Sequence, residues 1–192
     1  MKANEVALNS FLSQTKTQFI IPVYQRNYDW TEEQCRQLFY DIMEVGNRPG
    51  STHFIGSIVF IHEGVYTTSE VKQLVVIDGQ QRLTTFSLLY LALHKFALEN
   101  NKEEKANEIN DTYLVNKYVK EESSKLKLKQ SDNNAKALKF LSSNNNPEDY
   151  AEYSKVINNY NYFRENINNE NFKIILNGLN SLLFVEISLE RS

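Results

Sequence analysis

The chain has 192 residues, a formal net charge of −3, 41% hydrophobic residues and 23% charged residues. These values exclude an intrinsically disordered chain and fit one domain, or one domain with a helical appendage. The longest apolar stretch, residues 86–93, is much shorter than the roughly 20 residues that cross a bilayer, and residues 1–16 lack the apolar centre of a signal peptide. The single cysteine, Cys35, excludes an internal disulfide framework and fits a reducing compartment, so we expect a cytoplasmic protein without a membrane partner.

The charge is distributed evenly, with a net charge of −2 over residues 1–100 and −1 over residues 101–192. A protein that binds nucleic acid mainly through its phosphates normally carries a basic half or patch. The composition therefore gives no support for such a protein. Three scattered histidines and one cysteine also argue against a structural zinc site, and the sequence contains no P-loop or dinucleotide-binding motif.

A strand and a helix are predicted within residues 19–46. The run at residues 19–23 is rich in β-branched and aromatic residues and ends near Pro22. Thr31 and Gln34 have the spacing of a capping box, which predicts that a helix begins there. Four apolar residues recur at helical spacing and predict one buried face: Cys35, Leu38, Ile42 and Val45.

Further strands and a buried helix are predicted between residues 54 and 98. Residues 54–61 predict a strand, residues 62–64 a hairpin turn and residues 65–68 the returning strand. The four apolar residues 74–77 predict a strand that is buried on both faces. Residues 80–98 predict a helix that is apolar nearly all round and that therefore lies at the centre of the fold.

The second half of the chain is rich in asparagine and mainly helical in pattern. Lysine and leucine alternate over residues 125–129, which predicts a short edge strand with a solvated lysine face. Helices are predicted over residues 133–141, with a cap at residues 131–132, and over residues near 150–167. Residues 182–189 predict a last strand, and a chain that stops just after such a strand suggests an N-terminal fragment of a longer protein.

Residues 75–85 carry the most unusual pattern, because a buried strand delivers small and polar residues to the start of a buried helix. Ligands collect at the carboxyl ends of strands in open sheets, and the free N–H groups of a helix start attract anions. Gly79 lets the backbone approach a ligand closely, and Arg82 is a bidentate partner for phosphate. Thr84 and Thr85 add hydroxyl groups, and Asp78 can hold a divalent ion. The segment has the chemistry of a phosphate-binding site.

A purely structural interpretation of the same segment stays open. Asp78 and Gln81 have the spacing of a capping box, which contributes on the order of 1 kcal/mol to a helix, and Gly79 can simply make the turn. This alternative leaves Gln80 and Arg82 unexplained at the entrance to a buried helix.

Residues 21–30 place an arginine between aromatic residues, just before the capped helix. Arg26 is a second candidate partner for phosphate, and an aromatic ring beside it can stack on a base. The alternative is that the aromatic side chains fix the entry to the helix and that Arg26 pairs with Asp29 or packs on Trp30. The aromatic candidates are Tyr24, Tyr28 and Trp30.

Gly56 interrupts the strand predicted over residues 54–61. A glycine inside a strand indicates either a bulge or a close approach of another group to the backbone. Room for a ligand and a plain packing requirement explain it equally well.

Together, the three segments resemble the DGQQR-motif family, which is the N-terminal domain of GmrSD-type, modification-dependent (type IV) restriction proteins and related phage-defence proteins. The motifs that carry the resemblance are Ile-Pro-x-Tyr-Gln-Arg-x-Tyr-x-Trp at residues 21–30, Phe-x-Gly-x-Ile at residues 54–58 and Val-Ile-Asp-Gly-Gln-Gln-Arg-Leu-Thr-Thr at residues 76–85. Residues 127–134 and 160–163 also look like that family, so the resemblance covers essentially the whole chain.

The resemblance implies an α+β fold, with a ParB/sulfiredoxin-like small mixed sheet, a central buried helix and an added helical C-terminal part. Residues 1–100 would form the core that carries the motif. Residues 101–192 would be a mainly helical extension that returns the strand at residues 182–189 to this core. In full-length relatives a C-terminal His-Asn-His nuclease domain usually follows and cuts the DNA, and this domain is absent from the present sequence. DNA would then be contacted through the full-length protein, and a homo-oligomer is compatible with the sequence.

The resemblance also implies nucleotide binding and hydrolysis coupled to DNA restriction. The triphosphate of a nucleoside triphosphate would lie over residues 79–81, where Arg26 and Arg82 neutralise its charge, and Asp78 would hold Mg²⁺ or another divalent cation. Gln80 or Gln81 would position the attacking water. The expected nucleotide-binding residues are Tyr24, Gln25, Arg26, Gly56, Gly79, Thr84 and Thr85, and the expected catalytic residues are Asp78, Gln80, Gln81 and Arg82. Two alternatives stay open, a non-catalytic module that binds nucleotide or modified DNA, and a ParB-like nuclease.

Overall fold

The structure is a computed structural model that describes residues 1–62 and 70–189. Its strands are β1 (Lys2–Ala7), β2 (Thr17–Ile20), β3 (His53–His62), β4 (Lys72–Asp78), β5 (Leu128–Lys129) and β6 (Leu182–Leu189). Its α-helices are α1 (Leu8–Leu12), α2 (Glu32–Gly46), α3 (Gln80–Glu99), α4 (Glu103–Ile109), α5 (Asp132–Ser142), α6 (Lys155–Asn166) and α7 (Phe172–Asn180). None of the helices in these residues is long and apolar enough to span a membrane.

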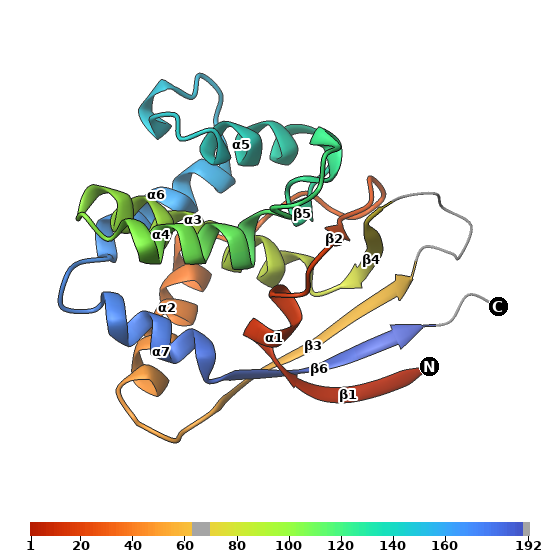
Figure 1. Cartoon of the computed structure of the whole chain (residues 1–192), viewed down its shortest axis with the longest axis horizontal. Coiled ribbons are helices and arrows are strands. Elements are labelled where there is room, and N and C mark those ends of the chain that lie inside the picture. Colours follow the sequence, from red (N-terminus) through yellow and green to blue (C-terminus); the bar gives the residue numbers. More distant parts are fainter. Residues whose placement is uncertain (63–69, 190–192) are drawn as a thin grey trace.

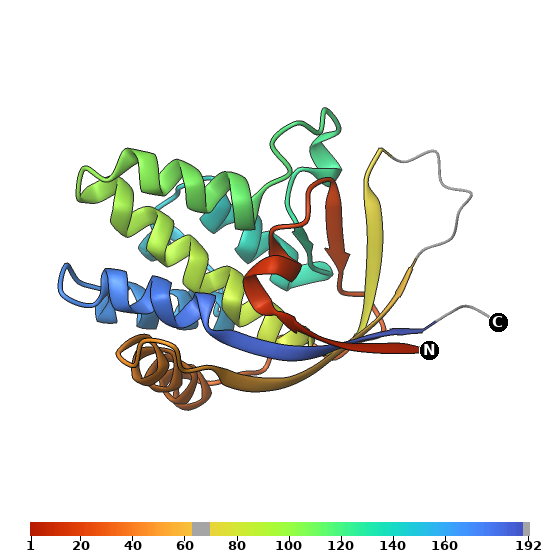
Figure 2. The ribbon, with the colours of Figure 1, turned by 60° about the horizontal axis from the view of Figure 1, so that its bottom comes forward.

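The six described strands form one mixed sheet in the order β1-β6-β3-β4-β2-β5. Strands β3 and β6 are parallel, β3 and β4 are antiparallel, and β2 is parallel to both of its neighbours, β4 and β5. Figure 1 shows the long strands β1, β6 and β3 side by side, and Figure 2 shows how strongly the sheet curves towards β4 and β2. The fold is therefore a mixed α/β architecture, as the sequence predicts at this coarse level.

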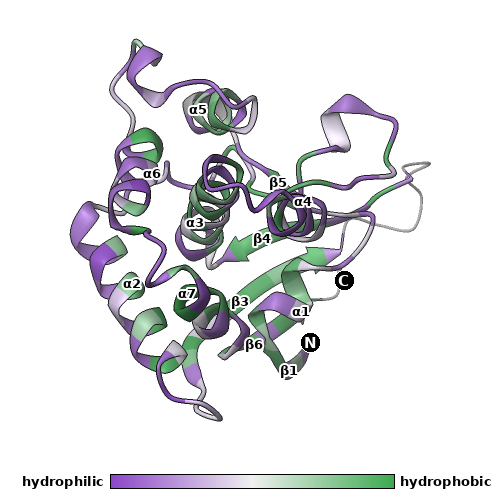
Figure 3. Ribbon diagram, turned by 60° about the vertical axis from the view of Figure 1, so that its left-hand side comes forward, coloured by the Kyte–Doolittle hydropathy of each residue, from purple (hydrophilic) through white to green (hydrophobic). Residues whose placement is uncertain are grey.

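Helix α3 lies at the centre of the fold, as its apolar sequence predicts. Helices α4, α5, α6 and α7 surround it in the end-on view of Figure 3. Fourteen of its side chains are buried, because neighbouring elements cover it on nearly every side. Buried residues from Leu8 to Phe184 form one continuous hydrophobic cluster, so both halves of the chain contribute to the same core.

Helix α2 confirms the predicted capping pattern and buried face. The Gln34 Oε1 accepts a hydrogen bond from the Thr31 backbone N–H at 2.6 Å, and the helix begins at the next residue. The four apolar residues at helical spacing, Cys35 to Val45, are all buried. Local sequence signals are sufficient here because both the cap and the apolar stripe lie within one helix.

Three predictions about the strands and α6 have different outcomes. The turn and returning strand predicted over residues 62–68 fall almost entirely outside the described residues. The strand predicted at residues 74–77 is confirmed, although only Leu74 and Val76 are fully buried while the alternate residues are half-buried. Helix α6 begins at Lys155 and not near residue 150, because Ser154 is its N-cap and accepts a hydrogen bond from the Ile157 N–H.

The solvated lysine face predicted for residues 125–129 is wrong at Lys127. Only two residues of this run form strand β5, and the Lys127 side chain is 3% exposed. Its ammonium group donates to the backbone carbonyls of Leu12 at 2.9 Å, Gln14 at 2.9 Å and Thr112 at 2.7 Å. Burial lowers the pKa of Lys127 to about 8. This buried lysine therefore connects its own segment to residues 12–14 and to Thr112.

Candidate functional site

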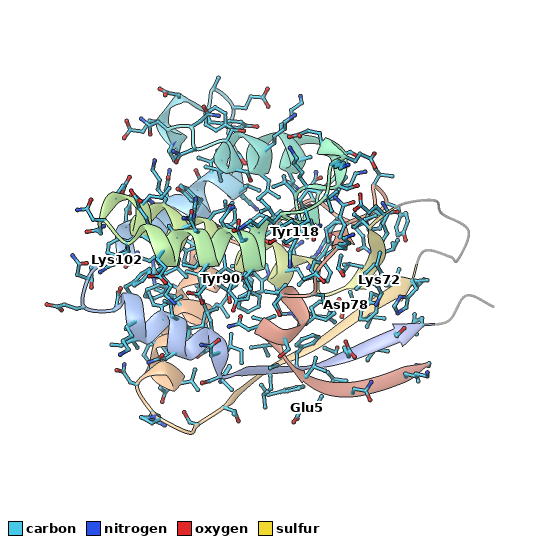
Figure 4. The ribbon with its side chains drawn as sticks, viewed as in Figure 1. Glu5, Lys72, Asp78, Tyr90, Lys102 and Tyr118 are labelled. Carbon is cyan, nitrogen blue, oxygen red and sulfur yellow. The ribbon has the colours of Figure 1, made fainter. Side chains whose placement is uncertain are left out.

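The sheet brings the three candidate segments to one edge. Strands β2 and β4 are parallel neighbours with Ile20 opposite Val75, so the segments that follow them leave the sheet at the same edge. Strand β3 runs in the opposite direction with Val59 opposite Asp78, which places its Gly56 beyond the end of β4. Asp78, labelled in Figure 4, is the last residue of β4 and is exposed.

A pocket of about 450 Å³ opens where these segments meet. All eight of its lining residues are candidates that the sequence selects, and one of them is the aromatic residue that ends the motif at residues 21–30. The lining residues are Gln25, Arg26, Trp30, Asp78, Gly79, Gln80, Gln81 and Arg82. Tyr24, Gly56, Thr84 and Thr85 do not line it.

The start of α3 is not capped by a side chain. Gly79 is the N-cap residue, with a φ of +95° that L-residues rarely adopt, and a Cβ atom on it would lie 3.0 Å from Ile58 Cγ1. The capping box between Asp78 and Gln81 is therefore not formed. The first N–H groups of a helix have no partner within it, so this start is open to an anion.

The motif glutamines have different tasks. Gln81 holds the loop before α2, since its Oε1 accepts from the Asp29 N–H at 2.8 Å and its Nε2 donates to the Asn27 carbonyl at 3.1 Å. Gln25 donates to the Ile77 carbonyl at 2.9 Å and accepts from Gln80 Nε2 at 3.2 Å. Within the described part of the chain, the Gln80 Oε1 has no hydrogen-bond partner.

Arg82 is held in place by strand β3. Its guanidinium donates to the carbonyl of Ile55, and a Cβ atom on Gly56 would collide with its Nη1. Gly56 has a φ of +97° and lies where the register of β3 against β6 shifts. The glycine therefore makes room for Arg82, which is a packing role that serves the pocket indirectly.

Arg26 is exposed and forms no ion pair with any described residue. Its expected alternative partner, Asp29, instead pairs with Lys155 of α6. The hydrogen bond and charge of Lys155 lower the pKa of Asp29, with a smaller contribution from the charge of Arg26. Arg26 and Arg82 thus approach the same pocket from two different segments, and only Arg82 is tied to the backbone.

Thr84 and Thr85 serve the interior of the fold. The Thr84 hydroxyl donates to the Gln80 carbonyl at 2.8 Å and accepts from Gln130. The Thr85 hydroxyl donates to the Gln81 carbonyl at 2.8 Å and lies 2.7 Å from the Tyr28 hydroxyl. Both threonines are buried, so the structure does not bring them to the pocket.

The aromatic candidates also separate. Tyr24 is 71% exposed, whereas burial holds the pKa of the Tyr28 hydroxyl well above its usual range. Asn159 of α6, which the sequence reasoning missed, donates to the Tyr28 hydroxyl at 2.9 Å and to the Trp30 carbonyl at 2.8 Å. An asparagine beside Ile157 and Tyr160 on the buried stripe of an amphipathic helix is the signal that could have identified it.

The pocket suits a metal ion that arrives with its ligand. No cluster of three or more histidine, cysteine or carboxylate side chains that could hold a metal occurs in residues 1–62 and 70–189. Asp78 does line the pocket as an exposed carboxylate. Mg²⁺ in phosphate-transfer sites is commonly held by one or two carboxylates plus phosphate oxygens and water, so this donor set fits.

One of two comparisons with known proteins places the chain in a family. A search of curated proteins found no match. The profile of one protein family, described as GmrSD restriction endonuclease, N-terminal domain, matches residues 8–192. Since this match spans nearly all of the 192 residues, the chain belongs to the family of GmrSD restriction endonuclease N-terminal domains.

Proposed function

We propose that this domain binds a nucleoside triphosphate together with Mg²⁺ and hydrolyses it, as the regulatory part of a DNA restriction and phage-defence protein. One observation carries the proposal. Arg26, Arg82 and the exposed Asp78 border a single pocket at the uncapped start of α3. Cations, a carboxylate and open backbone N–H groups are what a metal–triphosphate complex requires.

The charges favour a triphosphate over a neutral ligand. Arg26 and Arg82 each carry one positive charge, and a helix start adds about half a positive charge. Asp78 offsets one of these charges and becomes compatible with the phosphates when Mg²⁺ lies between them. Fixed positive groups of this kind stabilise the charge that shifts among phosphate oxygens during hydrolysis.

Gln80 is the better candidate for positioning the attacking water. Both ends of the Gln81 amide are engaged with the backbone of residues 27–30, whereas Gln80 uses only its Nε2. The free Oε1 of Gln80 can accept a hydrogen bond from a water molecule at the edge of the pocket. Glutamine has this task in other nucleoside triphosphatases.

Family membership supports the proposed coupling to DNA. A GmrSD N-terminal domain suggests a longer protein in which a His-Asn-His-type nuclease domain acts on DNA. The mixed sheet and the central buried helix α3 support our proposal that the fold is ParB/sulfiredoxin-like. We expect nucleotide binding to regulate that nuclease domain, which is compatible with the absence of a basic half in this chain.

The test is Mg²⁺-dependent phosphate release from each of the four ribonucleoside triphosphates. We expect release by the wild type and its loss in Arg26→Ala and Asp78→Asn, two exposed positions at which substitution leaves the core intact. Arg48→Ala is the matched control, since Arg48 is exposed, pairs with Glu44 and does not line the pocket. Arg82→Lys reports on the second arginine while keeping a cation that can contact Ile55.

The possible outcomes separate the proposal from its alternatives. Equal release by wild type and Arg26→Ala would exclude catalysis at this pocket. No release, with nucleotide still raising the thermal unfolding temperature, would indicate a binding module without catalysis. Cleavage of modified DNA by the chain itself with Mg²⁺ would indicate a ParB-like nuclease.

A further inference from the structure

A second pocket, of about 330 Å³, adjoins the first, and Trp30 lines both. Its walls come from the start of α2 and from one face of α6. We propose that this second pocket binds the base and ribose of the nucleotide whose triphosphate occupies the first pocket, with the indole of Trp30 as the stacking surface. The inference rests on the proposed function and extends it to recognition of the nucleoside.

Trp30 is held from both sides. Its backbone N–H donates to Gln81 Oε1 at 3.3 Å, and its carbonyl accepts from Asn159 Nδ2 at 2.8 Å. Its half-buried side chain packs partly against the hydrophobic core. These hydrogen bonds fix the backbone of Trp30, its ring packs partly on the core, and tryptophan offers a large flat surface for stacking.

Neither of the other aromatic candidates can take this position. The Tyr28 ring is buried, and its hydroxyl is bonded to Thr85 and Asn159. Tyr24 lines neither of the two pockets. The structure therefore selects one of the three aromatic residues that the sequence offers.

The charges assign the two ends of the nucleotide. The cations of the first pocket, Arg26 and Arg82, suit phosphate, whereas Lys155 in the second pocket already pairs with Asp29. Glu165 also lines the second pocket and would repel phosphate. A carboxylate accepts hydrogen bonds well from ribose hydroxyls, so the same group favours the sugar.

Two asparagines of α6 complete the recognition. Asn158 and Asn161 line the second pocket, and neither side chain is bonded to another described residue. A free carboxamide offers both donors and an acceptor, which match the edge of a base. Because Gln81 accepts a hydrogen bond from the Trp30 N–H and Trp30 lines both pockets, this one residue links the two pockets.

The test compares nucleoside triphosphates with inorganic tripolyphosphate, which has the phosphates but no base or ribose. Trp30 is the single tryptophan of the chain, so its fluorescence reports directly on the proposed stacking. In the wild type with Mg²⁺, we expect a nucleoside triphosphate to change this fluorescence and tripolyphosphate to leave it nearly unchanged. Calorimetry should show at least tenfold tighter binding of the preferred nucleotide than of tripolyphosphate.

Variants separate the two parts of the ligand. Asn161→Ala and Trp30→Leu should weaken nucleotide binding about tenfold or more and leave tripolyphosphate binding unchanged. Arg26→Ala should weaken both. Tyr40→Ala is the aromatic control, because Tyr40 is exposed on α2 and lines neither pocket. Asn161→Ala keeps the test valid if Trp30→Leu fails to fold.

The two proposals fail in different ways. If both probes bind and neither Trp30→Leu nor Asn161→Ala affects the nucleotide more than tripolyphosphate, the nucleoside subsite is refuted while the phosphate site stands. If neither probe binds the wild type, the proposed function is refuted, and the subsite falls with it.

Discussion

Replacement of Gly56 by alanine tests whether this residue exists to accommodate Arg82. Gly56 has a φ of +97°, and a Cβ atom there would collide with the Arg82 Nη1. The backbone strain alone costs about 1–2 kcal/mol for an L-residue. Displacement of the guanidinium also breaks its hydrogen bond to the Ile55 carbonyl, and a hydrogen bond to a charged group contributes about 1.5–3 kcal/mol. We therefore expect Gly56→Ala to lower the free energy of unfolding by about 2.5–5 kcal/mol.

Gly50 provides a matched control for the strain. Its φ is +80°, but a Cβ atom there would meet no other atom within 4 Å. Gly50→Ala should therefore cost about 1–2 kcal/mol, through the backbone alone. The difference between the two glycine variants measures the collision with Arg82.

Urea unfolding of a double-mutant cycle decides the question. In an Arg82→Ala background the collision is absent, so Gly56→Ala should cost no more than Gly50→Ala does in the wild type. The expected coupling between positions 56 and 82 is about 1.5–3 kcal/mol, and that between positions 50 and 82 is close to zero. Equal, additive effects at the two glycines would refute the argument that Gly56 makes room for Arg82.

Three further predictions concern stability, reactivity and the loop before α2. Lys127→Met should lower the free energy of unfolding measured with urea by about 2–4 kcal/mol, because one buried and two partly buried carbonyls lose their donor. Since burial lowers the folded pKa of Lys127 to about 8, the unfolded chain binds more protons above that pH, and wild-type stability should rise relative to Lys127→Met up to about pH 10.5. Burial raises the pKa of the Cys35 thiol to about 11, so a disulfide reagent at pH 8 should label it only after denaturation, and labelling of the native protein would contradict this. Gln81→Leu should loosen residues 27–30 and weaken nucleotide binding with the core intact, which limited proteolysis and calorimetry can check.

Sequence patterns within a single helix are sufficient to predict that helix. The cap at Thr31 and the apolar stripe from Cys35 place α2 correctly, since both lie within one helix. The sequence does not predict strand β1, because its residues are mostly exposed and it is held by pairing with β6 some 180 residues later. Lys127 was misplaced because alternation predicts a side chain's face only where a strand actually forms.

In the candidate site, too, the sequence predicts which residues matter but not how they come together. The sequence identifies Asp78, Arg82 and Arg26 as a set, but their meeting depends on the parallel pairing of β2 and β4, which no local pattern reveals. Thr84 and Thr85 are adjacent to the motif in sequence yet lie on the buried side of α3. Nearness along a helix does not place a side chain in a pocket, because each residue turns by about 100° from the last.

The five residues of the Asp-Gly-Gln-Gln-Arg motif are best understood as a ligand-facing set and a supporting set. Asp78, Gln80 and Arg82 line the pocket, and each has a polar side-chain group that can contact a ligand there. Gly79 and Gln81 instead shape the backbone, one through its positive φ and the other through its bonds to the loop at residues 27–30. Substitutions of Asp78 and Gln80 should therefore change ligand chemistry at nearly constant stability, whereas substitution of Arg82 also removes its hydrogen bond to the Ile55 carbonyl. Substitutions in the second set should change stability and affinity together, because they alter the frame that holds Trp30 and the start of α3.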